Sequence, residues 1–149
     1  LQEVSRSMEF NVLVVDDSSV MRAMIIRTLK MSGIPLGDLH EAENGARALE
    51  VLGANWVDLA LVDINMPVMN GEELIDRVRD NPEFRDLAVI VVSTESSETR
   101  IEKVQRQGAR FVHKPFTPEI LREEVLATTG VSHESRLDSG IETSGELDF

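Results

Sequence analysis

The chain has 149 residues, of which 27 are acidic and 15 basic, so its formal net charge at pH 7 is −12. This acidity argues against nonspecific nucleic-acid binding, which depends on neutralising phosphates, and an aromatic content of 4% disfavours base-stacking platforms. The absence of cysteine excludes disulfide scaffolds, thiolate metal sites and thiol nucleophiles. No apolar run has the roughly 18 residues of a membrane helix, and residues 1–7 lack a signal peptide's apolar core. We therefore expect a cytoplasmic protein without a membrane partner.

Composition divides the chain into three parts. Residues 1–8 are mostly polar and contain Met8, a candidate natural start, which predicts an N-terminal extension or an expression remnant. Residues 9–127 carry the alternating apolar and amphipathic segments of one compact domain. Residues 128–149 are rich in Ser, Gly and Glu, with five acidic residues against the single basic Arg136. This composition predicts an acidic, flexible tail.

Strand and helix patterns alternate along the compact domain. Short apolar runs predict strands at residues 12–15, 38–42, 57–62, 87–92 and 110–113. Amphipathic patterns predict helices at residues 18–32, 44–52, 72–79, 97–107 and 117–127. The first, third and fourth strands are continuously apolar, which is typical of strands covered on both faces. With right-handed crossovers, this order predicts an α/β fold, a doubly wound five-stranded parallel sheet with helices on both faces.

Polar residues follow four of the predicted strands. In parallel sheets of this kind, ligands bind outside the carboxyl ends of the strands. At those ends the sequence has Asp16, Asp17, Asp63, Asn65, Ser93 and Lys114. We therefore expect three carboxylates, a hydroxyl and an ammonium to lie close together at one edge of the sheet.

This set of side chains indicates phosphoryl transfer to an aspartate. Crowded carboxylates repel one another unless a cation joins them, and hard oxygen ligands suit Mg²⁺. A lysine and a serine hydroxyl could hold the remaining phosphoryl oxygens. An aspartate can itself attack phosphorus and form an acyl phosphate. Positioning and charge neutralisation are most of what such a transfer needs.

Each residue taken alone also has an ordinary structural explanation. Asp17 is typical of a helix N-cap and Asp63 of a turn at a strand end. Ser93 could cap the helix that follows it, and Lys114 could be a solvated surface lysine. Their joint occurrence at the ends of four separate strands favours the functional interpretation.

With these residues, the sequence resembles the receiver domain of two-component response regulators. It closely resembles the stand-alone chemotaxis (CheY-like) type. The matching stretches are Val12–Asp17, Asp63–Pro67 with Met69 and Gly71, Val92–Glu95, and Lys114–Phe116. Their order and spacing span residues 10–127. The resemblance implies a flavodoxin-like sheet with strand order 2-1-3-4-5.

The resemblance also implies how the acidic cluster works. Asp63 would be the phosphoacceptor. Mg²⁺ would be bound by the carboxylates of Asp17 and Asp63, by Asp16 through water, and by the backbone carbonyl of Asn65. Lys114 would pair with the phosphoryl oxygens.

Further positions would carry the switch and the lifetime of the phosphorylated state. Ser93 and Phe111 would be the switch hydroxyl and the switch aromatic, and the peptide bond before Pro115 would be cis. Asn65 and Glu95 would tune the attacking water, and this pair is the one found in fast-cycling chemotaxis regulators. The resemblance therefore implies a short-lived acyl phosphate.

The switch would act on a surface formed by residues 97–107, 110–113 and 117–127. A phosphoryl group adds about two negative charges, which would bias this surface between two states. The same surface carries a basic patch, which we define as Arg100, Lys103, Arg106 and Arg110. The patch indicates a docking site for an acidic partner, and a solvated helix face balanced by neighbouring glutamates explains it equally well.

The predicted function is a single-domain response regulator that catalyses only its own phosphorylation and dephosphorylation. A histidine kinase would be its phosphodonor and a downstream protein its target, with no nucleic-acid partner, and we expect a monomer. One alternative is a phosphatase of the haloacid-dehalogenase type, but such enzymes have a second Asp where this chain has Asn65. Another is a constitutively binding pseudo-receiver, which usually lacks one of the acidic residues or the lysine. A receiver detached from an output domain is disfavoured by the short stretch after residue 128.

Overall fold

Strands and helices alternate through residues 9–130, the part of the chain that the computed structural model describes. The strands are β1 (Phe10–Val15), β2 (Leu36–Ala42), β3 (Leu59–Val62), β4 (Ala88–Ser93) and β5 (Arg110–His113). The helices are α2 (Ser19–Met31), α3 (Gly45–Ala54), α4 (Gly71–Asp80), α5 (Glu98–Arg106) and α6 (Pro118–Thr129). Each predicted strand and helix is present, and no end differs from its predicted position by more than two residues.

The strands form one parallel sheet in the order β2-β1-β3-β4-β5. This confirms both the doubly wound α/β fold and the strand order that the resemblance implied. The chain leaves β1 toward β2 on one side and returns to β3 on the other, so the direction of winding reverses between β1 and β3. That reversal places the ends of these two strands at the topological switch point, where ligands bind in such sheets.

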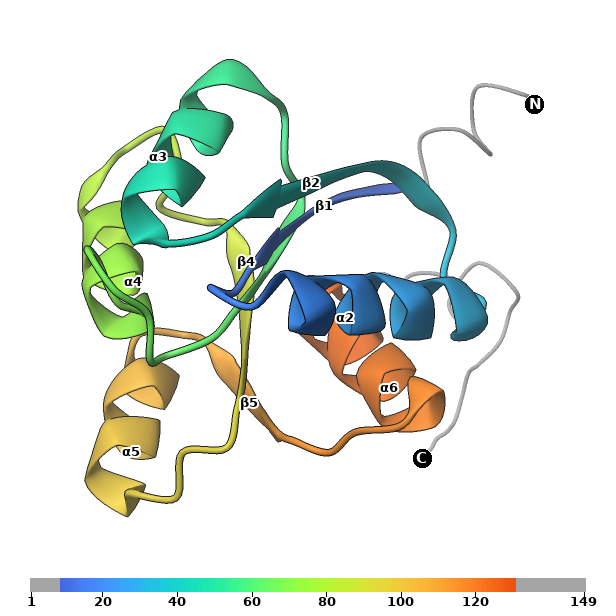
Figure 1. The fold of residues 1–149 in the computed structure, drawn as a ribbon. Coiled ribbons are helices and arrows are strands. Elements are labelled where there is room, and N and C mark those ends of the chain that lie inside the picture. The colour runs from blue at the N-terminus through green and yellow to red at the C-terminus, as the bar shows by residue number, and fades with distance from the viewer. Residues whose placement is uncertain (1–8, 131–149) are drawn as a thin grey trace, which may run out of the picture.

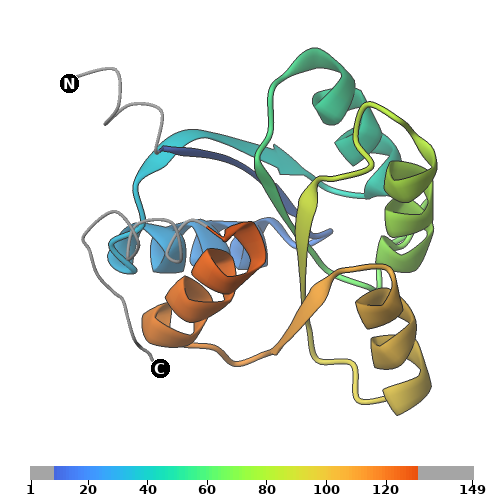
Figure 2. The same cartoon turned by 180° about the vertical axis from the view of Figure 1, so that it is seen from behind.

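Helices cover both faces of the sheet. Figures 1 and 2 show α2 and α6 on one side, and α3, α4 and α5 on the other. Each layer has its own apolar core, one containing Leu29 and Leu121, the other Leu52, Leu74 and Val104. All four residues of β3 are buried, as the continuous apolar run predicted. The central strands are therefore packed on both faces, and this fixes where the polar residues that follow them leave the sheet.

The carboxyl-terminal boundary of the domain lies further along than predicted. Helix α6 continues to Thr129 and ends at Gly130, whose φ of 76° suits a glycine. Thr128 and Thr129 therefore belong to the domain, not to the tail, because the helical pattern has no breaker before Gly130. The predicted extension at residues 1–8 and the tail beyond residue 130 lie outside the described residues. Within the described chain, no helix is long and apolar enough to cross a membrane.

Candidate functional site

Three carboxylates meet at the carboxyl ends of β1 and β3. Oxygen atoms of Asp16, Asp17 and Asp63 all lie within 4.8 Å of one another. The ammonium of Lys114, which follows β5, lies 3.2 Å from Asp16 Oδ2 and 3.9 Å from Asp63 Oδ1. The side chains of Asp63 and Lys114 are only 11% and 14% exposed, so the solvated-lysine explanation is wrong. The sheet thus brings together residues up to 98 positions apart.

The start of α2 shows what each of the two adjacent aspartates does. Asp16 is buried, and its Oδ1 accepts a hydrogen bond from the Ser18 backbone N–H at 2.9 Å. The N-cap of α2 is Ser18, whose hydroxyl accepts from Met21 N–H. Asp17 is therefore not the cap, and its exposed carboxylate stays available for a ligand.

The loop after β3 fixes the backbone around Asp63. Asp63 N–H donates to the Val15 carbonyl at 2.9 Å, and its own Oδ1 accepts from Ile64 N–H. Gly71 N–H then donates to the Ile64 carbonyl at 2.8 Å. A Cβ on Gly71 would lie 2.3 Å from the Asp63 carbonyl oxygen, so only glycine permits this close approach.

Ser93 is fully buried at the end of β4, beside the carboxylates. Its hydroxyl accepts a hydrogen bond from Glu95 N–H at 3.1 Å and favours the ionised form of the Asp63 carboxyl. The N-cap of α5 is Ser97, so Ser93 does not cap that helix. The Lys114–Pro115 peptide bond is cis. On β5, the half-buried Phe111 packs against the core under α3, α4 and α5.

The surroundings of Asp63 raise the pKa of its carboxyl above the ordinary value of 3.8. Burial is the largest cause, and the negative charge of Asp16 acts in the same direction. Part of this rise in pKa is offset by three groups that favour the ionised carboxylate, namely Lys114, the Ser93 hydroxyl and the Ile64 N–H. Without a cation, the ionised Asp63 carboxylate therefore destabilises the fold.

We expect Asp63→Asn to raise the Tm of the metal-free protein at pH 7 by about 2–5 °C. Because the carboxyl has the higher pKa in the folded state, the free energy of unfolding falls as pH rises from 3.8 through that raised pKa. The side-chain amide introduced by Asp63→Asn does not ionise, so it causes no such fall in the free energy of unfolding. Thermal unfolding in a chelator checks this, and the Tm difference should shrink as pH is lowered toward 3.8. An Asn variant no more stable than the parent at pH 7 would contradict the account.

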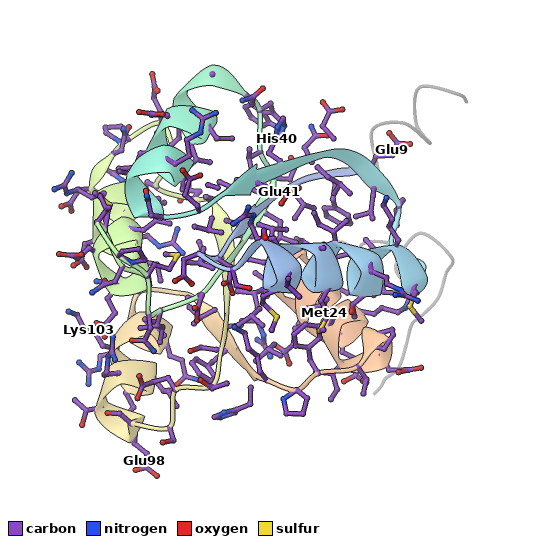
Figure 3. The ribbon with its side chains drawn as sticks, in the orientation of Figure 1. Glu9, Met24, His40, Glu41, Glu98 and Lys103 are labelled. Carbon is purple, nitrogen blue, oxygen red and sulfur yellow. The ribbon has the colours of Figure 1, made fainter. Side chains whose placement is uncertain are left out.

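The basic patch is largely neutralised by neighbouring carboxylates. Arg100 pairs with two glutamates, Arg106 with Glu102 at 3.7 Å, and Arg110 with Glu124. Among residues 9–130, only Lys103 of the four has no carboxylate partner. Figure 3 shows Lys103 and Glu98 pointing outward from α5. These pairs favour the balanced helix face over a free cationic surface.

Three contacts around the site were not foreseen from the sequence. Arg22 on α2 donates to the Asp16 carbonyl at 2.6 Å and pairs with Glu41 at 2.8 Å. Glu72 on α4 binds Arg100, 28 positions away. No spacing rule links residues so far apart, because the contact depends on how α4 and α5 are rotated against the sheet.

The donor set fits Mg²⁺. Oxygen ligands are what this cation prefers, and it is usually held by one or two carboxylates together with water and phosphate oxygens. Asp17 is exposed enough to keep water at the ion, while the buried Asp16 and the mostly buried Asp63 supply fixed negative charge. Receiver domains bind Mg²⁺ at an acidic pocket of this kind, and the aspartate cluster here matches it.

Comparison with known proteins identifies the family. Residues 12–126 match the response regulator receiver domain. The chain is 38% identical to chemotaxis protein CheY1 of Helicobacter pylori over 122 residues, which cover 80% of this chain and 97% of the relative. It is 40% identical over 120 residues to a CheY homolog of Campylobacter jejuni, covering 79% and 91%. The solved structure of CheY4 of Vibrio cholerae superimposes with a TM-score of 0.71 at 30% identity, covering 80% and 98%. The chain therefore belongs to the response regulator receiver domains of two-component signalling, and its relatives are CheY-like.

Proposed function

We propose that this receiver domain accepts a phosphoryl group on Asp63 from a histidine kinase, in a reaction that requires Mg²⁺. The observation that carries the proposal is the position of the Asp63 carboxylate. It lies within 4.8 Å of two further carboxylates and 3.9 Å from the Lys114 ammonium. A nucleophile between a cation site and an ammonium suits the transfer of a charged phosphoryl group.

Asp16, Asp17 and Asp63 would hold the cation, together with the backbone carbonyl of Asn65. Bound Mg²⁺ would neutralise charge on the phosphoryl oxygens. An Asp63 carboxylate oxygen forms the new bond to phosphorus as the bond to the donor histidine nitrogen breaks. Lys114, freed from its pairing with Asp16, binds a phosphoryl oxygen.

The switch begins at Ser93. The Ser93 hydroxyl favours the ionised form of the Asp63 carboxyl, and a phosphoryl group on Asp63 would attract the hydroxyl proton of Ser93 to one of its own oxygens. Movement of Ser93 would make room for the half-buried Phe111 ring to turn inward. The surface of α5, β5 and α6 then changes, and a downstream protein binds one state more tightly than the other.

The polar side chains two positions after Asp63 and Ser93 set how long the signal lasts. The Asn65 amide oxygen and the Glu95 carboxylate accept hydrogen bonds from the same guanidinium nitrogen of Arg100, and Asn65 is exposed to solvent while Glu95 is partly exposed. We therefore propose a short-lived acyl phosphate. Such a cytoplasmic, monomeric switch would perform no chemistry beyond gaining and losing its own phosphoryl group.

Intact-mass measurement with acetyl phosphate tests this function. The wild-type chain should gain the mass of one phosphoryl group in the presence of Mg²⁺ and none in a chelator. Asp63→Asn should gain none under either condition. A folded wild-type chain that binds Mg²⁺ but is not modified would support the pseudo-receiver instead, and persistence of the modified form for hours with Mg²⁺ would contradict the short lifetime.

A further inference from the structure

Arg100 on α5 joins three separate segments at the rim of the Asp63 site. One guanidinium nitrogen, Nη1, donates to Glu95 Oε1 at 2.7 Å and to Asn65 Oδ1 at 3.2 Å. The other two nitrogens, Nε and Nη2, donate to the two carboxylate oxygens of Glu72 at 3.3 and 3.2 Å. We call this set of four residues the Arg100 clamp. It ties the loop after β3, the loop after β4 and the first turn of α4 to α5.

Burial and charge make the clamp more durable than a surface ion pair. The side chains of Glu72 and Glu95 are each 15% exposed, and that of Arg100 is 33% exposed, so water screens them only in part. The bidentate pairing with Glu72 raises the pKa of Arg100. The Ser97 backbone N–H lowers the pKa of Glu95, and Arg100 adds to that effect. Arg100 and Glu95 are therefore both charged at neutral pH.

The clamp is connected to the phosphoacceptor by two short routes. In one, Glu95 N–H donates to the Ser93 hydroxyl, which favours the ionised form of the Asp63 carboxyl. In the other, Asn65 lies two residues after Asp63, and its Oδ1 accepts from the same Arg100 nitrogen that donates to Glu95. Arg100 itself makes no contact with the carboxylate cluster among the described residues. Its influence on Asp63 must therefore pass through Asn65 and Glu95.

We propose that Arg100 is a positioning residue that orders Asn65 and Glu95 for hydrolysis of the aspartyl phosphate, an inference that rests on the proposed function. In hydrolysis, a water oxygen bonds phosphorus while the bond from phosphorus to Asp63 Oδ breaks and its electron pair stays on the carboxylate. Both protons of the water leave with inorganic phosphate. The water must approach opposite the breaking bond. An amide and a carboxylate fixed at the rim can hold it there, and they lose this ability when they move freely.

The experiment phosphorylates the chain with acetyl phosphate, removes this donor, and measures the rate at which the phosphoryl group is lost. The variants compared with wild type are Arg100→Gln and Glu72→Ala. We expect both variants to lose the phosphoryl group about three- to tenfold more slowly than wild type. The double variant should match Arg100→Gln alone, because Glu72 acts only through Arg100. Arg106→Gln is the matched control. It removes the same charge from the same helix and should leave the rate unchanged, because within residues 9–130 the ion pair of Arg106 is with Glu102 and not with the clamp.

Two further readouts separate positioning from general destabilisation. The rate of phosphorylation by acetyl phosphate should stay within about twofold of wild type, because Asp63, the cation ligands and Lys114 are untouched. In the unphosphorylated protein, the NMR signals of the Asn65 side-chain amide should shift in Arg100→Gln and not in Arg106→Gln. All rates are to be taken well below each variant's unfolding midpoint.

Several outcomes would overturn the inference. One is phosphoryl loss from Arg100→Gln at the wild-type rate or faster, and another is equal slowing in Arg106→Gln. The third is an NMR signal of the Asn65 side-chain amide that does not shift in Arg100→Gln. The amide measurement needs no phosphorylation. If the wild-type chain takes no phosphoryl group, the proposed function fails, while an Asn65 amide that still shifts would leave the positioning contact itself intact.

Discussion

Replacing Asp17 with asparagine should weaken Mg²⁺ binding by about 10- to 100-fold, and phosphorylation should slow with it. Asp17 supplies one of three carboxylate oxygens within 4.8 Å of one another. It is exposed, and the cap of α2 is the neighbouring Ser18, so the fold does not depend on its carboxylate. The loss should therefore appear in metal binding with the helix intact.

Isothermal titration of Mg²⁺ at constant ionic strength measures this effect. Asp38→Asn is the matched control, because Asp38 is an exposed aspartate on β2 outside the cluster. It removes the same charge from the chain and should bind Mg²⁺ as wild type does. Equal affinities for Asp17→Asn and wild type would mean that the cluster is not the metal site.

The second large effect is expected from Lys114→Met. The ammonium lies beside Asp16 and Asp63 and is mostly buried, so it is positioned for charge that develops on the phosphoryl group. Loss of one such donor typically costs about 10²-fold in rate. Mg²⁺ binding should be retained or strengthened, because a cation that competes for the same carboxylates is removed.

Phosphorylation by acetyl phosphate at saturating Mg²⁺ isolates the role of this lysine. Lys103→Met on the outer side of α5 is the matched control and should react as wild type. A slow reaction in Lys114→Met, together with Mg²⁺ binding as strong as in wild type, would show that Lys114 acts on the phosphoryl group and not on metal binding. A Lys114→Met chain that is phosphorylated at the wild-type rate would contradict the role given to the lysine.

The sequence predicted the elements and the cluster well because both depend on local rules. Apolar runs identified the buried strands, and parallel strands end at a common edge, so Asp16, Asp63 and Lys114 had to lie near one another. The boundary at residue 127 was placed too early, because α6 ends where Gly130 permits a left-handed turn. Such an end depends on one residue and not on a periodic pattern.

The sequence could not predict which side chains pair with one another. The basic patch could be read equally as a free surface or a balanced one, and only the packing of α4 and α6 against α5 and β5 supplied Glu72 and Glu124 as partners. Likewise, nothing in the sequence distinguished Ser18 from Asp17 as the cap of α2. These contacts depend on helix rotation and rotamers, which residue spacing alone does not fix.

The central claim is that Asp63 carries the phosphoryl group, and chemical trapping tests it most directly. Borohydride reduces an aspartyl phosphate to homoserine, so treatment after reaction with acetyl phosphate and Mg²⁺ marks the modified residue. Peptide mass mapping should find homoserine in place of Asp63, only in samples that contained Mg²⁺. Homoserine in place of Asp16, Asp17 or another residue, or no homoserine at all in a folded chain that binds Mg²⁺, would contradict the account.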